Sequence, residues 1–427
     1  MKISGNAFLF LALLTPMVLV PLTMQAQSGN TPAPIEITIW YSLFGKAESF
    51  YTSTQEQFQK EHPGVIVIFE EHGWGEELRR NLVKALEAGN PPDIVVGENY
   101  FQHFAELGAL VPLNDAIADI KDNLVPGTHK AAKYKGQIYG LSIFSGVFGF
   151  ERNCAVIEAA GLDCDSPPKT WDDLLEQAQI ISEQGDGQYS GYTLQGPGGY
   201  ALGSVFRIAT YLNQSGASLC KNNCTYPYFN DPRAMPALEF IRKINRYTPP
   251  GLTFNPDEAQ VYEQLFQGLS AYQIAGSWHP QWAKDSGCHD CRYSSVPIPT
   301  NGKPASMIVG NTIFAVLKQS THPNVAVEWL KFMVSDQVQH RIYPELGRLP
   351  STRSALAALR PDADPATRTF IDELLNTLNL GILPQWRQNP QELWRIYNTL
   401  LTQVLTTERP IEDIMNEAQA AAEQVMN

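Results

Sequence analysis

The stretch Ala-Gly-Asn-Pro-Pro-Asp-Ile-Val-Val-Gly, residues 88–97, joins the end of a helix to the start of a buried strand. Residues 76–88 before it place three leucines on one helical stripe: Leu78, Leu82 and Leu86. Gly89 then stands where a left-handed C-terminal cap is favoured, and residues 93–97 form a short apolar run. A helix that leads into a buried strand is typical of an α/β fold with a parallel sheet covered on both faces.

The same alternation extends along the chain in both directions. We expect strands at residues 35–41, 65–71 and 271–275, a helix at 101–107, and late helices near 324–335, 366–379, 390–406 and 411–425. Capping side chains mark the starts of three helices in the middle of the chain: Thr170 with Asp173 in the capping-box position, Asp231 before Pro232, and Asn255 before Pro256.

Length and charge restrict the possible functions. A chain of 427 residues is too long for one ordinary core, so we expect two domains. The formal net charge of -13 argues against nucleic acid as a partner, because phosphate recognition depends on clustered Lys and Arg. The same charge argues against docking on an anionic membrane surface.

The N-terminus carries the pattern of a secretory signal peptide over residues 1–26. Lys2 precedes an apolar run from Ala7 to Leu22 that prolines interrupt, and Ala26 precedes a possible cleavage point. The run is short for a membrane anchor, and no later stretch has spanning length. We therefore expect export to a periplasm and no integral membrane segment.

Six cysteines fit an oxidising compartment. They form three pairs close in sequence: Cys154 with Cys164, Cys220 with Cys224, and Cys288 with Cys291. Six cysteines allow 15 pairings, and we favour the three local disulfides because short turns bring their Cα atoms within reach. A zinc site formed by the last four of these cysteines is the alternative.

No signature of catalysis or cofactor binding is present. The chain lacks a phosphate-binding P-loop, a His-Glu-x-x-His metal motif and a Gly-x-Ser-x-Gly nucleophile turn. The glycine-rich residues 196–200 do not match a dinucleotide fingerprint, and the histidines show no metal-ligand spacing. We therefore expect no enzyme activity, no cofactor and no metal.

Several stretches, taken in order, resemble the family 1 extracellular solute-binding proteins, which include the maltose-binding components of ABC importers. They are residues 39–41 (Ile-Trp-Tyr), 61–65 (Glu-His-Pro-Gly-Val), 88–95, 108–113 (Gly-Ala-Leu-Val-Pro-Leu), 134–141, 160–162 (Ala-Gly-Leu), 168–174, 229–232 (Phe-Asn-Asp-Pro), 275–278 (Ala-Gly-Ser-Trp), 322–332 and 347–351 (Gly-Arg-Leu-Pro-Ser). Their order and spacing cover nearly the whole mature chain. One departure is Cys154, which stands where the family commonly has lysine.

The resemblance implies a periplasmic binding protein of type II-like fold, with a ligand cleft between two α/β lobes. Residues 35–145 with 295–318 would form the first lobe. Residues 150–292 with 323–427 would form the second lobe, whose C-terminal part is helical. Crossing strands would then act as the hinge, which explains why no flexible linker is present.

Ligands of open α/β sheets bind beyond the carboxyl ends of the strands, and the matching family positions lie there too. On the first lobe and its crossing segment we nominate Tyr41, Ser42, Phe44, Trp74, Glu98, Asn99 and Ser145. On the second lobe and the return crossing we nominate Tyr200, Trp278, Gly310, Asn311, Trp386, Arg387 and Trp394. For each of the tryptophans, packing in the core is the alternative.

The function implied is capture of a small solute, most simply a mono- to trisaccharide or polyol, for a permease. Aromatic side chains suit sugar rings, and fixed polar partners suit hydroxyl groups. A glycerol-phosphate-type ligand would require clustered cations, and the nominated loops offer only Lys46, Arg207 and Arg387. Two further function classes fit the same fold: a sensory partner of a membrane receptor, and an exported glycosidase. We expect a monomer.

Overall fold

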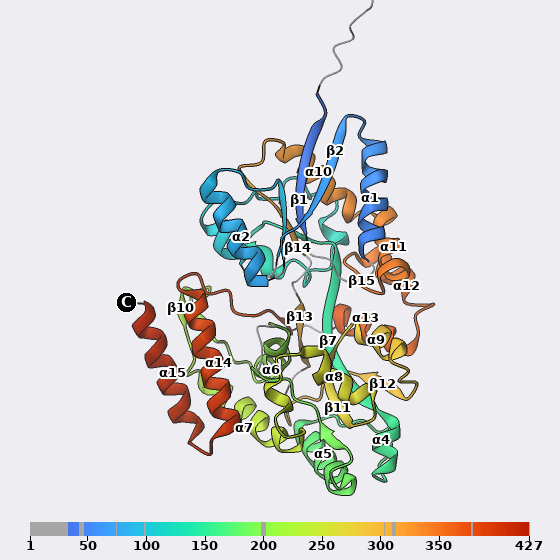
Figure 1. The fold of residues 1–427 in the computed structure, drawn as a ribbon, viewed down its shortest axis with the longest axis vertical. Helices are drawn as coiled ribbons and strands as arrows, with labels where there is room; N and C mark the ends of the chain where they lie inside the picture. The colour runs from blue at the N-terminus through green and yellow to red at the C-terminus, as the bar shows by residue number, and fades with distance from the viewer. Residues whose placement is uncertain are drawn as a thin grey trace, which may run out of the picture.

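Two mixed sheets, each with its own helices, form an upper and a lower lobe (Figure 1). The computed structural model describes residues 33–41, 47–73, 75–97, 100–197, 202–302, 304–309, 313–376 and 379–426. The predicted signal peptide lies outside these residues. No helix in the described ranges combines the length and the apolar character needed to cross a bilayer.

The first lobe is built on a five-stranded sheet. Its strands are, in sheet order, β2 (Val65–Glu71), β1 (Ile35–Tyr41), β3 (Ile94–Gly97), β14 (Ile313–Val316) and β6 (Leu141–Ser142). The first three are parallel, as the sequence predicts, and β14 returns antiparallel to β3. Packed against this sheet are α1 (Ala47–Glu61), α2 (Gly75–Ala88), α3 (Phe101–Glu106), α10 (Pro323–Met333) and α11 (Asp336–Leu346).

The second lobe is built on a sheet in which β7 (Phe144–Asn153) is central. Its order is β16 (Asn379–Gly381), β13 (Ala305–Val309), β7, β11 (Ser270–Gly276) and β8 (Ser190–Tyr192). Two further strands also pair with β7: β12 (Cys291–Ser294) and β15 (Leu349–Pro350). Because β7 follows directly on β6 of the first sheet, it is one of the strands that connect the lobes (Figure 1).

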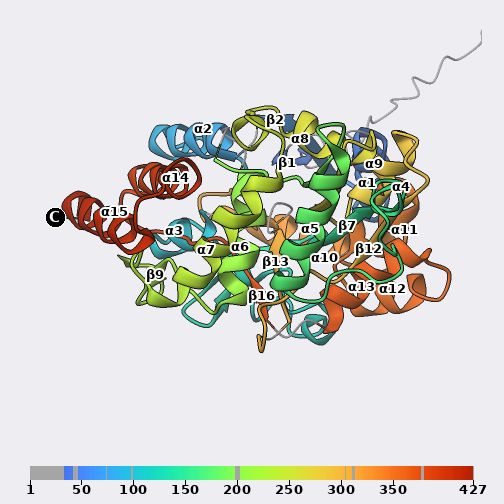
Figure 2. The ribbon, with the colours of Figure 1, turned by 90° about the horizontal axis from the view of Figure 1, so that it is seen from below.

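Helices cover this second sheet, and Figure 2 shows α5, α6 and α7 side by side beneath it, with α14 and α15 at one end. The helices of this part are α4 (Cys154–Ala159), α5 (Trp171–Gly185), α6 (Leu202–Gln214), α7 (Met235–Ile244), α8 (Glu258–Phe266), α9 (His279–Asp285), α12 (Arg353–Leu359), α13 (Pro365–Asn376), α14 (Pro390–Thr406) and α15 (Ile411–Met426). Two small hairpins complete the fold: β4 (Lys133–Tyr134) with β5 (Gln137–Ile138), and β9 (Cys220–Lys221) with β10 (Tyr226–Pro227).

Most of the predicted helix ends are confirmed, and one is wrong. Gly89 follows α2 with φ of 73°, and Thr170 and Asp173 form the complete capping box of α5. The helix predicted to start at Asn255 instead has Asp257 as its N-cap and begins at Glu258. The Asn255 side chain accepts a hydrogen bond from the backbone N–H of Asp257, so it forms a turn before the helix.

Two expectations about the second half of the chain have different outcomes. The three local disulfides are present, with Cα–Cα distances of 5.2, 4.8 and 5.6 Å, so the four cysteines of the zinc alternative are bonded in pairs.

The segment 323–346, expected in the second lobe, instead packs on the first-lobe sheet, where Trp329 and Ile342 are buried. The reason is that α10 follows β14, which already belongs to the first sheet.

A buried histidine of the first lobe makes stability depend on pH. Burial lowers the pKa of His129 to about 4, with Lys133 and Lys121 acting in the same direction, and its Nδ1 finds no hydrogen-bond partner among the described residues. The folded state therefore favours the neutral ring, while the unfolded chain takes up a proton near pH 6.5. This contribution to stability is present above pH 6.5 and is lost as pH falls towards 4, by about 3 kcal/mol in total.

We expect the free energy of unfolding of His129→Gln to decrease less between pH 7 and pH 4 than that of the parent protein. Urea unfolding at several pH values measures the difference, and the exposed His289→Gln is the matched control. Parallel pH curves for the parent and His129→Gln would contradict the assignment.

Candidate functional site

The boundary between the lobes is formed along β7. Ser145 pairs with Leu349 of β15, and its hydroxyl donates a hydrogen bond to the carbonyl oxygen of Pro350 at 3.0 Å. Further along, β7 has β13 on one edge and β11 on the other. Residues that follow β11 and residues on β13 or β16 therefore lie on opposite sides of β7.

On the β11 side, four side chains from two elements and two loops come together: Tyr41, Tyr51, Trp278 and Arg348. We name them the hinge cluster. Trp278 follows β11, and the guanidinium carbon of Arg348 lies 5.4 Å from the centre of its ring. Arg348 precedes β15 and interacts electrostatically with Tyr51 of α1. Tyr51 in turn packs edge-on against Tyr41, at the end of β1, with ring centres 5.2 Å apart. The cluster thus joins the second lobe to the first.

Local backbone explains why the Trp278 ring lies where it does. The ring folds back over Gly276, and a Cβ atom on that glycine would overlap the Trp278 ring. Phe148 of β7 packs edge-on against the same ring, with ring centres 5.7 Å apart. Glycine at position 276 is therefore required for the tryptophan to pack at this boundary.

Burial shifts the pKa values of the hinge cluster in opposite directions, down for the arginine and up for the tyrosines. Burial lowers the pKa of Arg348 to about 10, and the interaction with Tyr51 only partly opposes this shift. Burial raises the pKa of Tyr41, and the carboxylates of Glu71 and Glu48 raise it further. Burial likewise raises the pKa of Tyr51. Both tyrosines therefore stay protonated at neutral pH, and Tyr51 keeps its hydroxyl proton beside the cationic Arg348.

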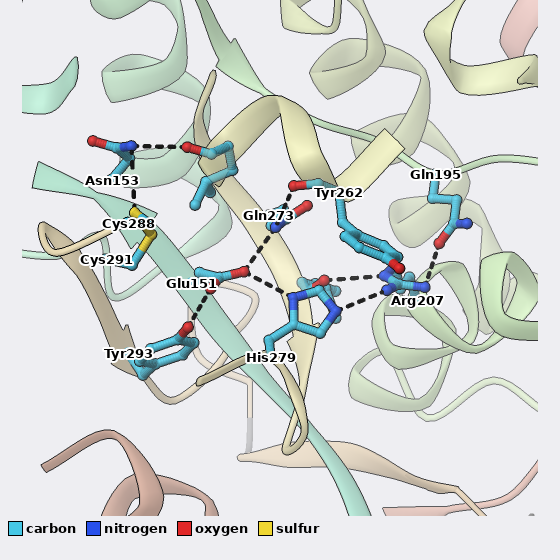
Figure 3. Close-up of polar contacts among 12 residues, drawn as sticks. Glu151, Asn153, Gln195, Arg207, Tyr262, Gln273, His279, Cys288, Cys291 and Tyr293 are labelled. Atoms are coloured by element: carbon cyan, nitrogen blue, oxygen red, sulfur yellow. Dashed lines mark hydrogen bonds and ion pairs between the residues drawn. A yellow bond between two sulfur atoms is a disulfide. The ribbon is translucent and has the colours of Figure 1, made fainter. Parts of the chain in front are cut away.

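Beneath Trp278, a buried polar network holds the start of α9 in place (Figure 3). Glu151 of β7 accepts hydrogen bonds from His279 Nδ1 at 2.9 Å, from Gln273 at 2.7 Å and from the Tyr293 hydroxyl. His279 Nε2 faces Arg207 at 3.3 Å, and Arg207 also forms an ion pair with Glu258 at 2.8 Å. These contacts assign a neutral His279 with its proton on Nδ1, consistent with burial lowering its pKa against the opposing effect of Glu151.

The chemistry of this network is structural. Glu151 and His279 are both 0% exposed, so a solute at the lobe boundary cannot reach either group. Together with Arg207 they link β7, α9 and α6, and they fix the turn that carries Trp278. In the described ranges no three potential metal-ligating side chains are grouped.

A separate cavity of about 610 Å³ lies on the β13 side of β7. It is lined by residues of both lobes, among them Lys130, Asn213, Gln385 and Arg387. Arg387 forms an ion pair with Glu106 at 3.1 Å, and its guanidinium carbon lies 4.7 Å from the centre of the Tyr134 ring. The nominated Arg387 is therefore a link between the lobes away from the hinge cluster.

The structure brings Tyr41 and Trp278 into one cluster but places other nominated residues elsewhere. Trp386 is 3% exposed and packs with Trp394 of α14 in the core of the second lobe, with ring centres 4.8 Å apart; Trp386 also packs on Phe229, and Trp394 on Tyr397. Ser145 is 2% exposed, and its hydroxyl is used within the hinge. The other nominated positions lie outside the described residues: Ser42, Phe44, Trp74, Glu98, Asn99, Tyr200, Gly310 and Asn311.

Two members of the hinge cluster were not nominated from the sequence. Arg348 lies within the Gly-Arg-Leu-Pro-Ser stretch that carries part of the family resemblance, so the sequence marks this segment without assigning the arginine a role. Tyr51 lies next to Phe50 on the buried face of α1. Neither residue follows the end of a parallel strand, and strand ends are where the sequence predicts ligand contacts.

The comparisons agree with a two-lobed binding protein. Residues 41–340 match the model of the bacterial extracellular solute-binding proteins. An uncharacterised ABC-transporter extracellular-binding protein of Pyrococcus horikoshii is 25% identical, over 80% of this chain and 76% of its own. The diacetylchitobiose-binding protein DasA of Streptomyces coelicolor is 22% identical, over 77% of this chain and 76% of its own.

Two further proteins extend the comparison. The sn-glycerol-3-phosphate-binding periplasmic protein UgpB of Escherichia coli is 23% identical, over 85% of this chain and 87% of its own. The solved structure of the sugar-binding protein MalE of Xanthomonas citri superposes with a TM-score of 0.79 at 18% identity, covering 92% of this chain and 97% of that one. With a family model that matches residues 41–340, this chain belongs to the bacterial extracellular solute-binding proteins.

Proposed function

We propose that this protein captures a small carbohydrate between its lobes and delivers it to the permease of an ABC importer. The observation that carries the proposal is the hinge cluster, in which Arg348 lies over a partly exposed tryptophan of one lobe and interacts with a tyrosine of the other, which packs on a second tyrosine. Aromatic rings pack on the apolar faces of sugar rings, and hydroxyl and guanidinium groups satisfy sugar hydroxyls. Closure of the lobes on the solute would then be the signal that the permease recognises.

The relatives support this substrate class. DasA is named for a disaccharide of an amino sugar, and MalE of Xanthomonas citri is named as a sugar-binding protein. We place the mature protein in the periplasm as a monomer, after removal of residues 1–26, and we assign it no catalytic role.

A second candidate ligand is a glycerol-phosphate-type solute. UgpB is named for sn-glycerol-3-phosphate. The structure also brings a further cation, Arg348, next to Trp278 at the lobe boundary. The function is then the same, and only the solute differs.

Titration of the mature protein with a panel of sugars, polyols and sugar phosphates tests the proposal. We expect a saturable change of tryptophan fluorescence with one chemical class, and a matching binding heat by calorimetry. A flat response across the whole panel in both measurements would contradict a carbohydrate or glycerol-phosphate solute.

A further inference from the structure

Arg348 is a partly buried cation at the lobe boundary that forms no ion pair with a carboxylate among the described residues. Its contacts there are the Trp278 ring and the electrostatic interaction with Tyr51. On the basis of the proposed function, we propose that the solute is an acidic sugar derivative, a sugar carboxylate or sugar phosphate, whose anionic group binds Arg348.

Three other arginines that connect elements have a carboxylate partner, while the buried Arg152 donates to the carbonyl oxygen of Cys164 instead. Arg207 pairs with Glu258 at 2.8 Å, and Arg387 pairs with Glu106 at 3.1 Å. Arg341, on the same helix that leads to Arg348, pairs with Glu345 at 2.6 Å. Unlike these three, Arg348 has no carboxylate partner among the described residues, so its charge can pair with a group of the solute.

Closure of the lobes makes an uncompensated cation unfavourable. A guanidinium group that loses water without gaining an anion keeps its desolvation cost, because hydroxyl groups supply hydrogen bonds but no counter-charge. A carboxylate or phosphate group accepts two parallel N–H bonds from the planar guanidinium and supplies the missing charge. An acidic solute therefore favours the closed form at Arg348 more than its neutral counterpart does.

The surroundings of the hinge cluster also orient such a solute. The guanidinium carbon of Arg348 lies 5.4 Å from the centre of the Trp278 ring, so a cation–π contact with the ring positions this charge beside the aromatic surface. At the opposite end of the cluster, Glu71 and Glu48 act on Tyr41, so an anionic group is repelled there. The anionic end of the solute should face Arg348, with the neutral hydroxyls towards Tyr41.

Calorimetry with matched pairs tests the proposal: glucose with glucuronate and glucose 6-phosphate, galactose with galacturonate, and glycerol with glycerol 3-phosphate. In the parent protein we expect the acidic member of at least one pair to bind about 30-fold or more tightly than the neutral member. In Arg348→Gln this preference should fall to about 3-fold or less, while Arg348→Lys should retain an intermediate preference because it keeps the charge but not the planar fork. The exposed Arg360→Gln, which loses only its pair with Asp372, is the matched control and should behave as the parent does.

The outcomes separate this inference from the proposed function. A neutral sugar that binds the parent as tightly as its acidic partner would leave the proposed carbohydrate function intact. It would overturn the proposal that the solute carries an anionic group. An acidic preference that survives in Arg348→Gln would overturn the role of Arg348. If no member of any pair binds the parent, both the solute class and this inference fail. A urea unfolding midpoint of Arg348→Gln close to that of the parent shows that a lost preference does not come from misfolding.

Discussion

Replacing Glu151 with leucine is expected to lower the free energy of unfolding by about 3–5 kcal/mol. Glu151 is fully buried and accepts hydrogen bonds from His279, Gln273 and Tyr293 at once. The substitution leaves three donors without this acceptor, and it removes the carboxylate that accepts the hydrogen bond of His279. Urea unfolding with an unchanged m-value measures the loss.

The matched control is Glu158→Leu, on the exposed face of α4 in the same lobe, which should change the free energy by less than about 0.5 kcal/mol. A second test uses coupling within the network. The substitution His279→Leu should cost clearly less in the Glu151→Leu background than in the parent, because the two residues act through one hydrogen bond. Additive costs, or a Glu151→Leu variant as stable as the control, would contradict the network.

Much of the fold could be predicted because local signals agree with the tertiary arrangement. The strands at 35–41 and 65–71 match β1 and β2 residue for residue, and Gly89 and the Thr170 capping box hold the places expected of them. The position of α10 and α11 could not be predicted in the same way. Their amphipathic pattern shows that one face is buried but does not say which of two sheets covers it.

The site could be predicted only where it follows the strand-end rule. Tyr41 and Trp278 follow that rule, and both belong to the hinge cluster. Trp386 shows the limit of composition as a guide, because a tryptophan in a helical region is as suited to the core as to a ligand. Arg348 shows the opposite limit, because only the tertiary structure reveals that this cation lacks a carboxylate partner in the described ranges.

Replacing Trp278 with alanine is expected to weaken solute binding by about 30-fold or more. The substitution removes the only aromatic surface of the second lobe in the hinge cluster, and it also removes the support on which the Arg348 guanidinium stacks. Calorimetry with the best ligand of the panel measures the change. Trp394→Ala is the matched control, since this ring packs on Trp386 in the core of the second lobe, with ring centres 4.8 Å apart; it should change the affinity by less than about 3-fold.

A double-mutant cycle with Arg348→Gln separates the two roles of Trp278. If the tryptophan acts on an anionic solute mainly by holding Arg348, the double variant should bind about as weakly as the weaker single variant, because the second change removes a contact already lost. If Trp278 instead acts only as a surface for the sugar ring, the two losses should add, and a neutral sugar should lose as much affinity as its acidic partner. An affinity of Trp278→Ala equal to that of the parent would remove the Trp278 ring from the binding site, and the role of Arg348 would then rest on the Arg348→Gln measurement alone.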